Sequence, residues 1–164
     1  MIHIVLYEPE IPQNTGNISR TCAATGCALH LIEPLGFDIS EKAVRRAGLD
    51  YWKYLRRTVH KSFEEFEQTA RGRMYFCTTK AAHTYSDIDY RTEEDLYFIF
   101  GRESFGLPER ILKQHPEECI RIPMIDEARS LNLSNAVAVI AYEALRQQEF
   151  GALQKIGHLT GRID

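Results

Sequence analysis

Three polar side chains follow the first apolar segment of the chain at a spacing that could bind an anion. Asn14, Asn17 and Arg20 lie three residues apart, so they share one face of a helix that begins near Thr15. Amides donate and accept hydrogen bonds, and a guanidinium presents several donors that suit a phosphate or a carboxylate. The alternative is that Asn14 caps the helix and Arg20 is a solvated surface residue.

A second candidate segment, residues 101–108, reads GRESFGLP. Its glycines have the spacing of a phosphate-binding loop, but Leu107 and Pro108 stand where that loop needs Lys and Ser or Thr, which excludes its chemistry. Gly101 and Gly106 permit a left-handed backbone or the close approach of a ligand, and Glu103 can accept hydrogen bonds from a cation or a loop amide. The alternative is a strand-to-helix turn in which Gly and Pro serve as punctuation.

A third segment joins a short apolar stretch to a long helix with one apolar face, on which Val137, Ile140 and Ala144 recur at helical spacing. Hydrogen-bonding groups crowd the segment, and they could also be simple capping and turn residues. All three candidate segments follow a predicted strand, and ligands of parallel sheets bind beyond the carboxyl ends of the strands. Together the segments therefore predict one binding site. The groups of the third segment are Arg129, Ser130, Asn132 and Asn135.

The elements that must position these segments alternate between strand and helix. Short apolar runs predict strands at residues 2–7, 28–33, 73–78, 96–100 and 119–122, and a weaker one at 57–60. Helices are predicted from Asn14 or Thr15 to Gly26, and over residues 40–48, 62–71 and 108–115, with Ser62 and Glu65 as a capping box. The alternation predicts an α/β fold with a mostly parallel sheet flanked by helices. We expect one domain over residues 1–150 and a C-terminal tail over 151–164.

Composition excludes several classes of protein. No apolar run approaches the roughly 20 residues of a membrane helix, and the N-terminus lacks the features of a signal peptide. The four cysteines form no CxxC pair, which favours free thiols in a reducing cytoplasm. Cysteines and histidines also lack the spacing of zinc ligands, so no metal is expected.

The net charge is −3, yet basic residues concentrate in one stretch. A local basic surface can bind phosphates whatever the total charge, and the alternative is a solvated helix and loop. The basic stretch comprises Lys42, Arg45, Arg46, Lys53, Arg56, Arg57 and Lys61, interrupted only by the acid Asp50.

Taken together, the three segments resemble the signature motifs of the SPOUT superfamily of RNA methyltransferases. The matching residues are Asn14-x-x-Asn17-x-x-Arg20, Gly101-x-Glu103-x-x-Gly106-Leu107-Pro108, and Ile122-Pro123-Met124 followed by residues 130–136, SLNLSNA. The opening IVLYEPEIPQNTGNISR and the segments RRAGLDYW and YEALRQ are similar to the small YibK/TrmL type, and the resemblance covers residues 2–147. It implies the SPOUT fold with a C-terminal trefoil knot, and a homodimer.

The resemblance also implies S-adenosylmethionine as the cofactor, held by the loops of the knot, and Arg20 as the catalytic residue. Because arginine holds its proton too firmly to act as a general base, we expect Arg20 to orient the ribose and phosphate and to stabilise a developing alkoxide. RNA contacts are implied at Asn17, Arg45, Arg46 and Tyr142, with Tyr142 also facing the second subunit. Cofactor contacts are implied at Cys77, Thr78, Thr79, Phe100, Gly101, Glu103, Gly106, Ile122, Pro123, Met124, Ser130, Leu131 and Asn135.

The implied reaction is methylation of the ribose 2′-hydroxyl of the wobble nucleotide, a cytidine or modified uridine at position 34, in leucine tRNAs. The expected partner is therefore tRNA, and the expected location is the cytoplasm. Two alternatives stay open. One is the same chemistry at another tRNA or ribosomal RNA nucleotide, and the other is a non-catalytic, RNA-binding knotted dimer.

Overall fold

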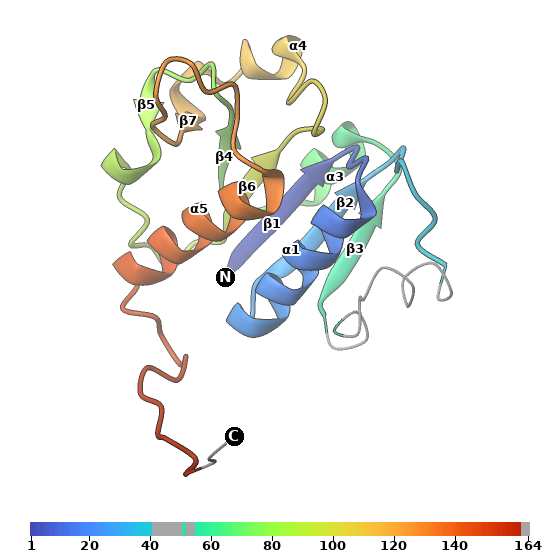
Figure 1. Ribbon diagram of the computed structural model, residues 1–164. Coiled ribbons are helices and arrows are strands. Elements are labelled where there is room, and N and C mark those ends of the chain that lie inside the picture. The colour runs from blue at the N-terminus through green and yellow to red at the C-terminus, as the bar shows by residue number, and fades with distance from the viewer. Residues whose placement is uncertain (41–50, 52–54, 162–164) are drawn as a thin grey trace.

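A parallel β-sheet forms the centre of the computed structural model, which describes residues 1–40, 51 and 55–161 (Figure 1). Within those residues the sheet has seven strands in the order β3-β2-β1-β6-β4-β7-β5, and all paired neighbours run parallel. The predicted α/β fold with a mostly parallel sheet flanked by helices is thus confirmed. The strands are β1 (Ile2–Tyr7), β2 (Ala28–Ile32), β3 (Arg57–His60), β4 (Arg73–Cys77), β5 (His83–Thr84), β6 (Leu96–Phe100) and β7 (Cys119–Arg121).

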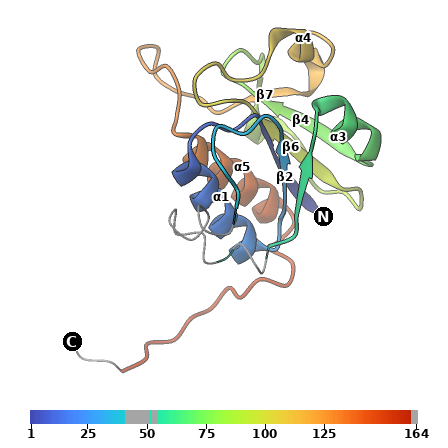
Figure 2. The same cartoon turned by 90° about the vertical axis from the view of Figure 1, so that its right-hand side faces the viewer.

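Helices cover both faces of the sheet. Helices α1 (Pro12–Thr25) and α5 (Leu133–Gln147) lie on one face, and α3 (Phe63–Thr69) lies on the other, as Figure 2 shows. Helix α4 (Glu109–Leu112) buries Ile111 and Leu112 in the same apolar cluster as α3. Short 3-10 helices lie in two of the connections: η2 (Tyr85–Asp87) follows β5, and η3 (Pro116–Glu118) precedes β7.

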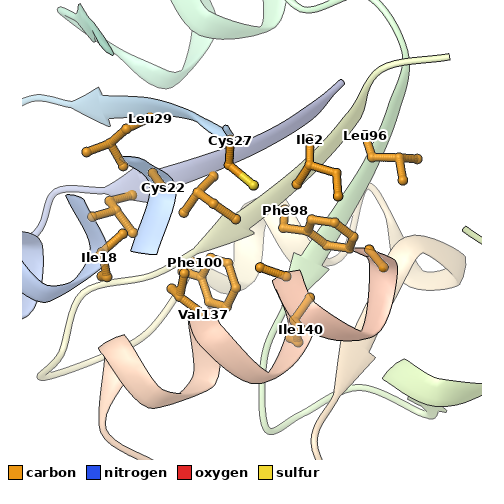
Figure 3. Packing of buried hydrophobic residues seen from close by; sticks show 14 of the residues in the cluster. Ile2, Ile18, Cys22, Cys27, Leu29, Leu96, Phe98, Phe100, Val137 and Ile140 are labelled. Atoms are coloured by element: carbon orange, nitrogen blue, oxygen red, sulfur yellow. The ribbon is translucent and has the colours of Figure 1, made fainter. Parts of the chain in front are cut away.

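The larger core lies between the sheet and the pair α1 and α5 (Figure 3). Ile18 and Cys22 of α1 and Val137 of α5 are fully buried against strand residues such as Leu29 and Phe98. Each large side chain buried in this way contributes about 1.5–3 kcal/mol relative to exposure. The core therefore fixes α1 and α5 relative to the strands, and with them the loops at the start of both helices.

The element boundaries differ from the prediction in places that have a local cause. Helix α1 begins at Pro12, with Ile11 at the N-cap and no side-chain cap, so the prediction that Asn14 or Thr15 caps it is wrong. Proline suits the first helical position because its φ is already helical and it has no N–H that needs a partner. The predicted Ser62 cap of α3 is confirmed, since its Oγ accepts the Glu65 N–H at 3.2 Å.

Other elements are shorter than predicted by one to a few residues. Helix α3 ends at Thr69 because Ala70 has extended backbone angles, and α4 stops at Leu112 instead of His115. The two-residue strand β5 is too short to have given an apolar run, and the sequence did not predict it. The helix predicted over residues 40–48 falls almost entirely outside the described residues.

The end of the chain runs away from the body after α5 (Figure 1). Leu153 still packs against the larger core, whereas Ile156 and Leu159 are exposed. The domain boundary near residue 150 stays a prediction, as does the trefoil knot. Among the helices of the described residues, none combines the length and the apolar character that crossing a bilayer requires.

Candidate functional site

A cavity of about 590 Å³ opens at the carboxyl ends of four neighbouring strands. Strands β1, β6, β4 and β7 are adjacent in the sheet, and the segments that follow them reach the cavity together. This edge is where parallel sheets bind ligands. The wall consists of Ile11, Asn14, Cys77, Thr78, Thr79, Phe100, Gly101, Arg102, Glu103, Ser104, Gly106, Ile120, Ile122, Met124, Arg129, Ser130, Leu131, Asn132, Leu133, Ala136 and Ile140.

A chain of side-chain hydrogen bonds joins the three predicted segments around this cavity. Asn14 donates from Nδ2 to Oε1 of Glu103 at 3.2 Å, and Asn132 donates from Nδ2 to Oδ1 of Asn14 at 3.0 Å. The same Glu103 carboxylate accepts the backbone N–H groups of Glu10 and Ile11 at 2.9 and 3.2 Å. Residues from the beginning, middle and end of the sequence are therefore held in one arrangement.

Glu10 makes a second link between the first two segments. Its carboxylate accepts the Ser104 hydroxyl at 2.8 Å and the Ser104 backbone N–H at 2.9 Å. These hydrogen bonds to Ser104, the hydroxyl first, lower the pKa of Glu10 below its ordinary value. The two segments thus exchange bonds in both directions, with Glu103 reaching toward Glu10 and Glu10 toward Ser104.

Position 101 requires glycine because the loop packs too closely around it to leave room for a side chain. A Cβ at Gly101 would lie 2.0 Å from the carbonyl carbon of Gly106 and 2.1 Å from the nitrogen of Leu107. Gly106 has a φ of 70° in the left-handed region, and its N–H donates to the carbonyl of Arg102 at 2.8 Å. The segment is therefore a tight, hydrogen-bonded turn whose backbone faces the cavity.

Asn132 both caps α5 and joins the network. Its Oδ1 accepts the backbone N–H groups of Ser134 and Asn135 at 2.9 and 3.4 Å, and the Ser134 hydroxyl at 2.6 Å. Such a cap contributes about 0.5–2 kcal/mol to helix stability. Because its amide nitrogen binds Asn14, the start of α5 is tied directly to the start of α1.

Two arginines give the cavity wall its positive charge. Arg102 Nη1 lies 3.1 Å from the Glu8 carboxylate, and Glu8 has a left-handed φ of 47°, which is uncommon outside glycine. Arg129 is exposed and makes no salt bridge with any residue that the structure describes. With respect to the described residues, Arg129 is therefore the cation of the wall that can meet a phosphate or carboxylate without first leaving a carboxylate partner.

The cysteine on the cavity wall is not suited to nucleophilic chemistry. Burial raises the pKa of the Cys77 thiol well above its ordinary value, so the thiol is neutral near pH 7. All four cysteines are free. Among the described residues no three His, Cys, Asp or Glu side chains gather as ligands for a metal ion. The wall offers backbone groups, amides, hydroxyls and two cations, which suit binding and positioning.

Most of the predicted cofactor residues lie on the wall. Pro123 and Asn135 do not line it; Pro123 is exposed, and the Asn135 N–H is used in the α5 cap. Arg102 is on the wall but is not among the residues that the sequence predicts for the site. Arg129 and Asn132 belong to the predicted third segment, but not to the cofactor contacts that the resemblance implies. The predicted residues on the wall are Cys77, Thr78, Thr79, Phe100, Gly101, Glu103, Gly106, Ile122, Met124, Ser130 and Leu131.

The apolar residues of the wall could not be predicted from the sequence by their chemistry. Ile11, Ile120 and Ile140 line the cavity, yet each comes from a different element and looks like an ordinary core residue. Only the meeting of the strand ends turns them toward one space. Apolar side chains mixed with a few polar groups are typical of small-molecule sites.

Of the predicted catalytic and RNA-contacting residues, the three that the structure describes are not on the cavity wall. Arg20 is exposed on α1, with its guanidinium carbon 5.3 Å from the centre of the Tyr51 ring, and it is not on the cavity wall of its own chain. Asn17 is likewise exposed on α1, whereas Asn14 is buried, so the predicted common face of the three residues divides into a buried and an exposed part. Tyr142 is 47% exposed on α5. Arg45 and Arg46 lie outside the described residues.

Comparison with known proteins gives a consistent result. The family described as SpoU rRNA Methylase matches residues 1–142. A protein of Listeria monocytogenes serotype 4b (strain F2365) is 56% identical over 153 residues, which are 92% of this chain and 90% of that protein. The tRNA (cytidine(34)-2'-O)-methyltransferase of Methylovorus glucosotrophus (strain SIP3-4) is 50% identical over 152 residues, covering 92% and 97% of the two chains.

Solved structures agree with this similarity. A structure described as giving insight into the 2-OH methylation of C/U34 on tRNA superposes with a TM-score of 0.83 at 46% identity. The match covers 91% of this chain and 97% of that one. The sheet order and the cavity edge described above therefore belong to an architecture shared over nearly the whole chain.

Proposed function

The chain belongs to the SpoU rRNA methylase family, and from this premise we propose that it methylates the ribose 2′-hydroxyl of nucleotide 34 in leucine tRNAs with S-adenosylmethionine. The observation that carries the proposal is the joining of three separated segments around one cavity by the bonds from Glu103 through Asn14 to Asn132. A cavity of about 590 Å³ lies within the usual range for small-molecule sites, roughly 300–1,000 Å³.

The residues of the wall fit the proposed cofactor. Backbone groups at Thr78, Gly101 and Ile122 can hydrogen-bond a heterocycle, and Ile120 and Ile140 offer apolar surface for its faces. When bound, S-adenosylmethionine supplies a methyl group on a sulfonium that a hydroxyl oxygen can attack. The predicted set on the wall, together with Asn132, would hold it.

The task of the chain's own residues is to position the ribose and to stabilise charge. We assign the catalytic role to Arg20, whose guanidinium would orient the ribose and phosphate while the 2′-hydroxyl gives its proton to a phosphate oxygen or to water. Arg20 is exposed on α1 and Tyr142 is 47% exposed on α5, so both side chains would be available to a second copy in the proposed homodimer. Asn17, Arg45 and Arg46 would bind the tRNA.

Nucleoside mass spectrometry tests the reaction and its site. Leucine tRNAs from cells that lack the protein should lose the 2′-O-methyl group at position 34 and regain it when the gene is restored. The purified protein with S-adenosylmethionine should methylate the same tRNAs in vitro. Loss of a methyl group at a different nucleotide would favour the second substrate class. RNA binding without any methyl transfer would favour the non-catalytic dimer.

Substitution of Arg20 tests the assigned role. Arg20→Ala should lower the turnover number about 100- to 1,000-fold, as removal of a group that stabilises transition-state charge commonly does. Arg20→Lys keeps the charge but loses the planar fork, so it should restore little activity. Both variants should keep the wild-type melting temperature and cofactor affinity because Arg20 is exposed. Near-normal turnover in Arg20→Ala would refute the role.

A further inference from the structure

Phe105 is a large aromatic residue placed in water beside the cavity. Its side chain is 80% exposed, while the neighbouring residues Ser104 and Gly106 line the cavity wall. Two other apolar side chains of the wall, Ile11 and Leu131, are each 42% exposed. The mouth of the cavity therefore has an apolar rim, and Phe105 is its most exposed member.

The backbone holds Phe105 in a fixed position. The N–H of Gly106 donates to the carbonyl of Arg102 at 2.8 Å and closes the turn that carries Phe105. On the preceding residue, the backbone N–H and hydroxyl of Ser104 both bind the Glu10 carboxylate. A ring on such a pre-organised turn costs little conformational entropy when a partner packs against it.

The ring of Phe105 lies beside Arg102, and carboxylates lie near it as well, because Glu8 binds Arg102 and Glu10 binds Ser104. The guanidinium carbon of Arg102 lies 5.9 Å from the centre of the Phe105 ring, and Arg102 is itself fixed by Glu8. Arg129, also on the wall, is exposed. An exposed aromatic ring together with an exposed arginine is a combination that binds single-stranded nucleic acid, because bases stack on the ring and phosphates meet the cation.

We propose that Phe105 is a base-stacking residue for the RNA substrate, and that an unpaired base next to the target nucleotide stacks on its ring. The proposal rests on the proposed function, since a ribose that reaches the cavity brings its neighbouring bases to the rim. It names the RNA loop, rather than a second protein copy, as the occupant of this surface. The exposed guanidinium of Arg129 on the cavity wall can meet an RNA phosphate, which favours that choice.

Three substitutions separate stacking from simple apolar contact. Phe105→Ala removes the ring, Phe105→Leu keeps apolar volume without a π-face, and Phe105→Trp keeps a π-face. The probe is an anticodon stem-loop RNA with 2-aminopurine at either position next to nucleotide 34. Ala and Leu should each weaken RNA binding about 5- to 150-fold, the range of one lost base stack, whereas Trp should stay within about twofold of wild type.

The accompanying readouts are specific to stacking. The wild type and Phe105→Trp should change the 2-aminopurine fluorescence, and Ala and Leu should not. In methylation assays Ala and Leu should raise KM for RNA and leave kcat nearly unchanged at saturating RNA. Affinity for S-adenosylmethionine, the melting temperature and the oligomeric state should be the same in all four proteins.

Several results would overturn the proposal. Wild-type RNA affinity in Phe105→Leu would mean that any apolar group suffices, and a changed oligomeric state in Phe105→Ala would assign the surface to a second copy. If Phe105→Ala methylates position 34 with wild-type KM, stacking is refuted while the proposed function stands. If the wild type fails to methylate position 34 but still shows the Phe105-dependent fluorescence change, the proposed function is refuted and stacking stands.

Discussion

At the scale of single residues, Glu103 and Gly101 hold the cavity wall together although both lie in an irregular loop: Glu103 through hydrogen bonds, and Gly101 by allowing the backbone to pack closely. Glu103 accepts three hydrogen bonds from the segment that begins α1, at Glu10, Ile11 and Asn14. A carboxylate placed at the start of a helix is also favoured by the helix dipole. Glu103, although it lies in a distant loop, thus accepts backbone hydrogen bonds at the start of α1, as a local N-cap side chain would otherwise do.

Glu103→Ala should destabilise the fold and open the cavity. Two backbone N–H groups and one amide would lose a charged acceptor, and we expect a loss of about 2–3 kcal/mol in the free energy of unfolding. For a chain of this size that corresponds to roughly 5–10 °C in melting temperature. Affinity for S-adenosylmethionine should fall as well. Glu93→Gln, at an exposed carboxylate, is the control, and an unshifted melting temperature in Glu103→Ala would contradict the bracing role.

Gly101 and Gly106 form a matched pair for substitution by alanine. In Gly101→Ala the new Cβ meets backbone atoms of the same turn, so we expect a loss of about 3 kcal/mol or more together with loss of cofactor binding. In Gly106→Ala the new Cβ has no atom within 4 Å beyond its own residue and its two chain neighbours, so only the left-handed φ is penalised, at about 1–2 kcal/mol. Urea unfolding would measure both, and equal losses would show that close packing is not the reason for Gly101.

At the scale of elements, a row of histidines links three neighbouring strands. Nδ1 of His3 on β1 lies 2.9 Å from Nε2 of His30 on β2, and Nδ1 of His30 lies 2.9 Å from Nε2 of His60 on β3. At its outer end His3 Nε2 lies 3.5 Å from Asp95, which also binds the N-terminal ammonium. Each imidazole pair needs one N–H and one bare nitrogen, so neutral rings satisfy the row.

The histidine row should make the fold less stable in mild acid. Burial is the first cause that lowers the pKa of His3, His30 and His60, and the charges of His3 and His60 add to it at His30, whose pKa falls to about 4. Below the unfolded value of about 6.5 the unfolded chain binds protons that the folded chain does not. The free energy of unfolding should therefore fall as the pH drops from about 6.5 toward 4, and stay level above it.

His30→Gln tests this dependence because glutamine keeps one donor and one acceptor but does not titrate. The variant should have a shallower slope of unfolding free energy against pH between 4.5 and 6.5. His158→Gln, on the exposed chain after α5, should keep the wild-type slope. The same slope in His30→Gln and wild type would show that the buried row is not what responds to acid.

At the scale of the whole molecule, the site arises from the order of the strands in the sheet. β1 and β7 are separated by most of the sequence but only by β6 and β4 in space. Their carboxyl ends face one edge because every pair is parallel, and four loops meet there. The larger core between the sheet, α1 and α5 keeps those loops in register with one another.

The charge of the whole chain predicts how tRNA binding should respond to salt. The net charge is −3, so attraction to tRNA must come from local cations such as Arg45 and Arg46. Replacing both with Glu should weaken tRNA binding and make its dependence on salt less steep, because fewer counterions are released. Filter binding across a salt series measures both quantities. Unchanged affinity at low salt would remove these residues from the tRNA surface.

The sequence alone determined the order and type of most elements. Strands at Ile2–Tyr7 and Leu96–Phe100 and the cap of α3 at Ser62 could be predicted because apolar runs and capping patterns act over a few neighbouring residues. Candidate segments could also be found, since Asn, Ser, Arg and Gly stand out by chemistry. For the same reason, the sequence motifs predicted most of the polar residues on the cavity wall.

Only the tertiary structure decided which of those groups meet. The strand order, the bond from Asn132 to Asn14, the place of Ile140 on the cavity wall and the exposure of Arg20 all depend on contacts between residues far apart in the chain. Such contacts are chosen by the burial of apolar surface over the whole sheet, which no short window of sequence contains. The start of α1 could not be predicted from nearby residues for the same reason, because the backbone N–H of Ile11 donates to a carboxylate more than ninety residues away.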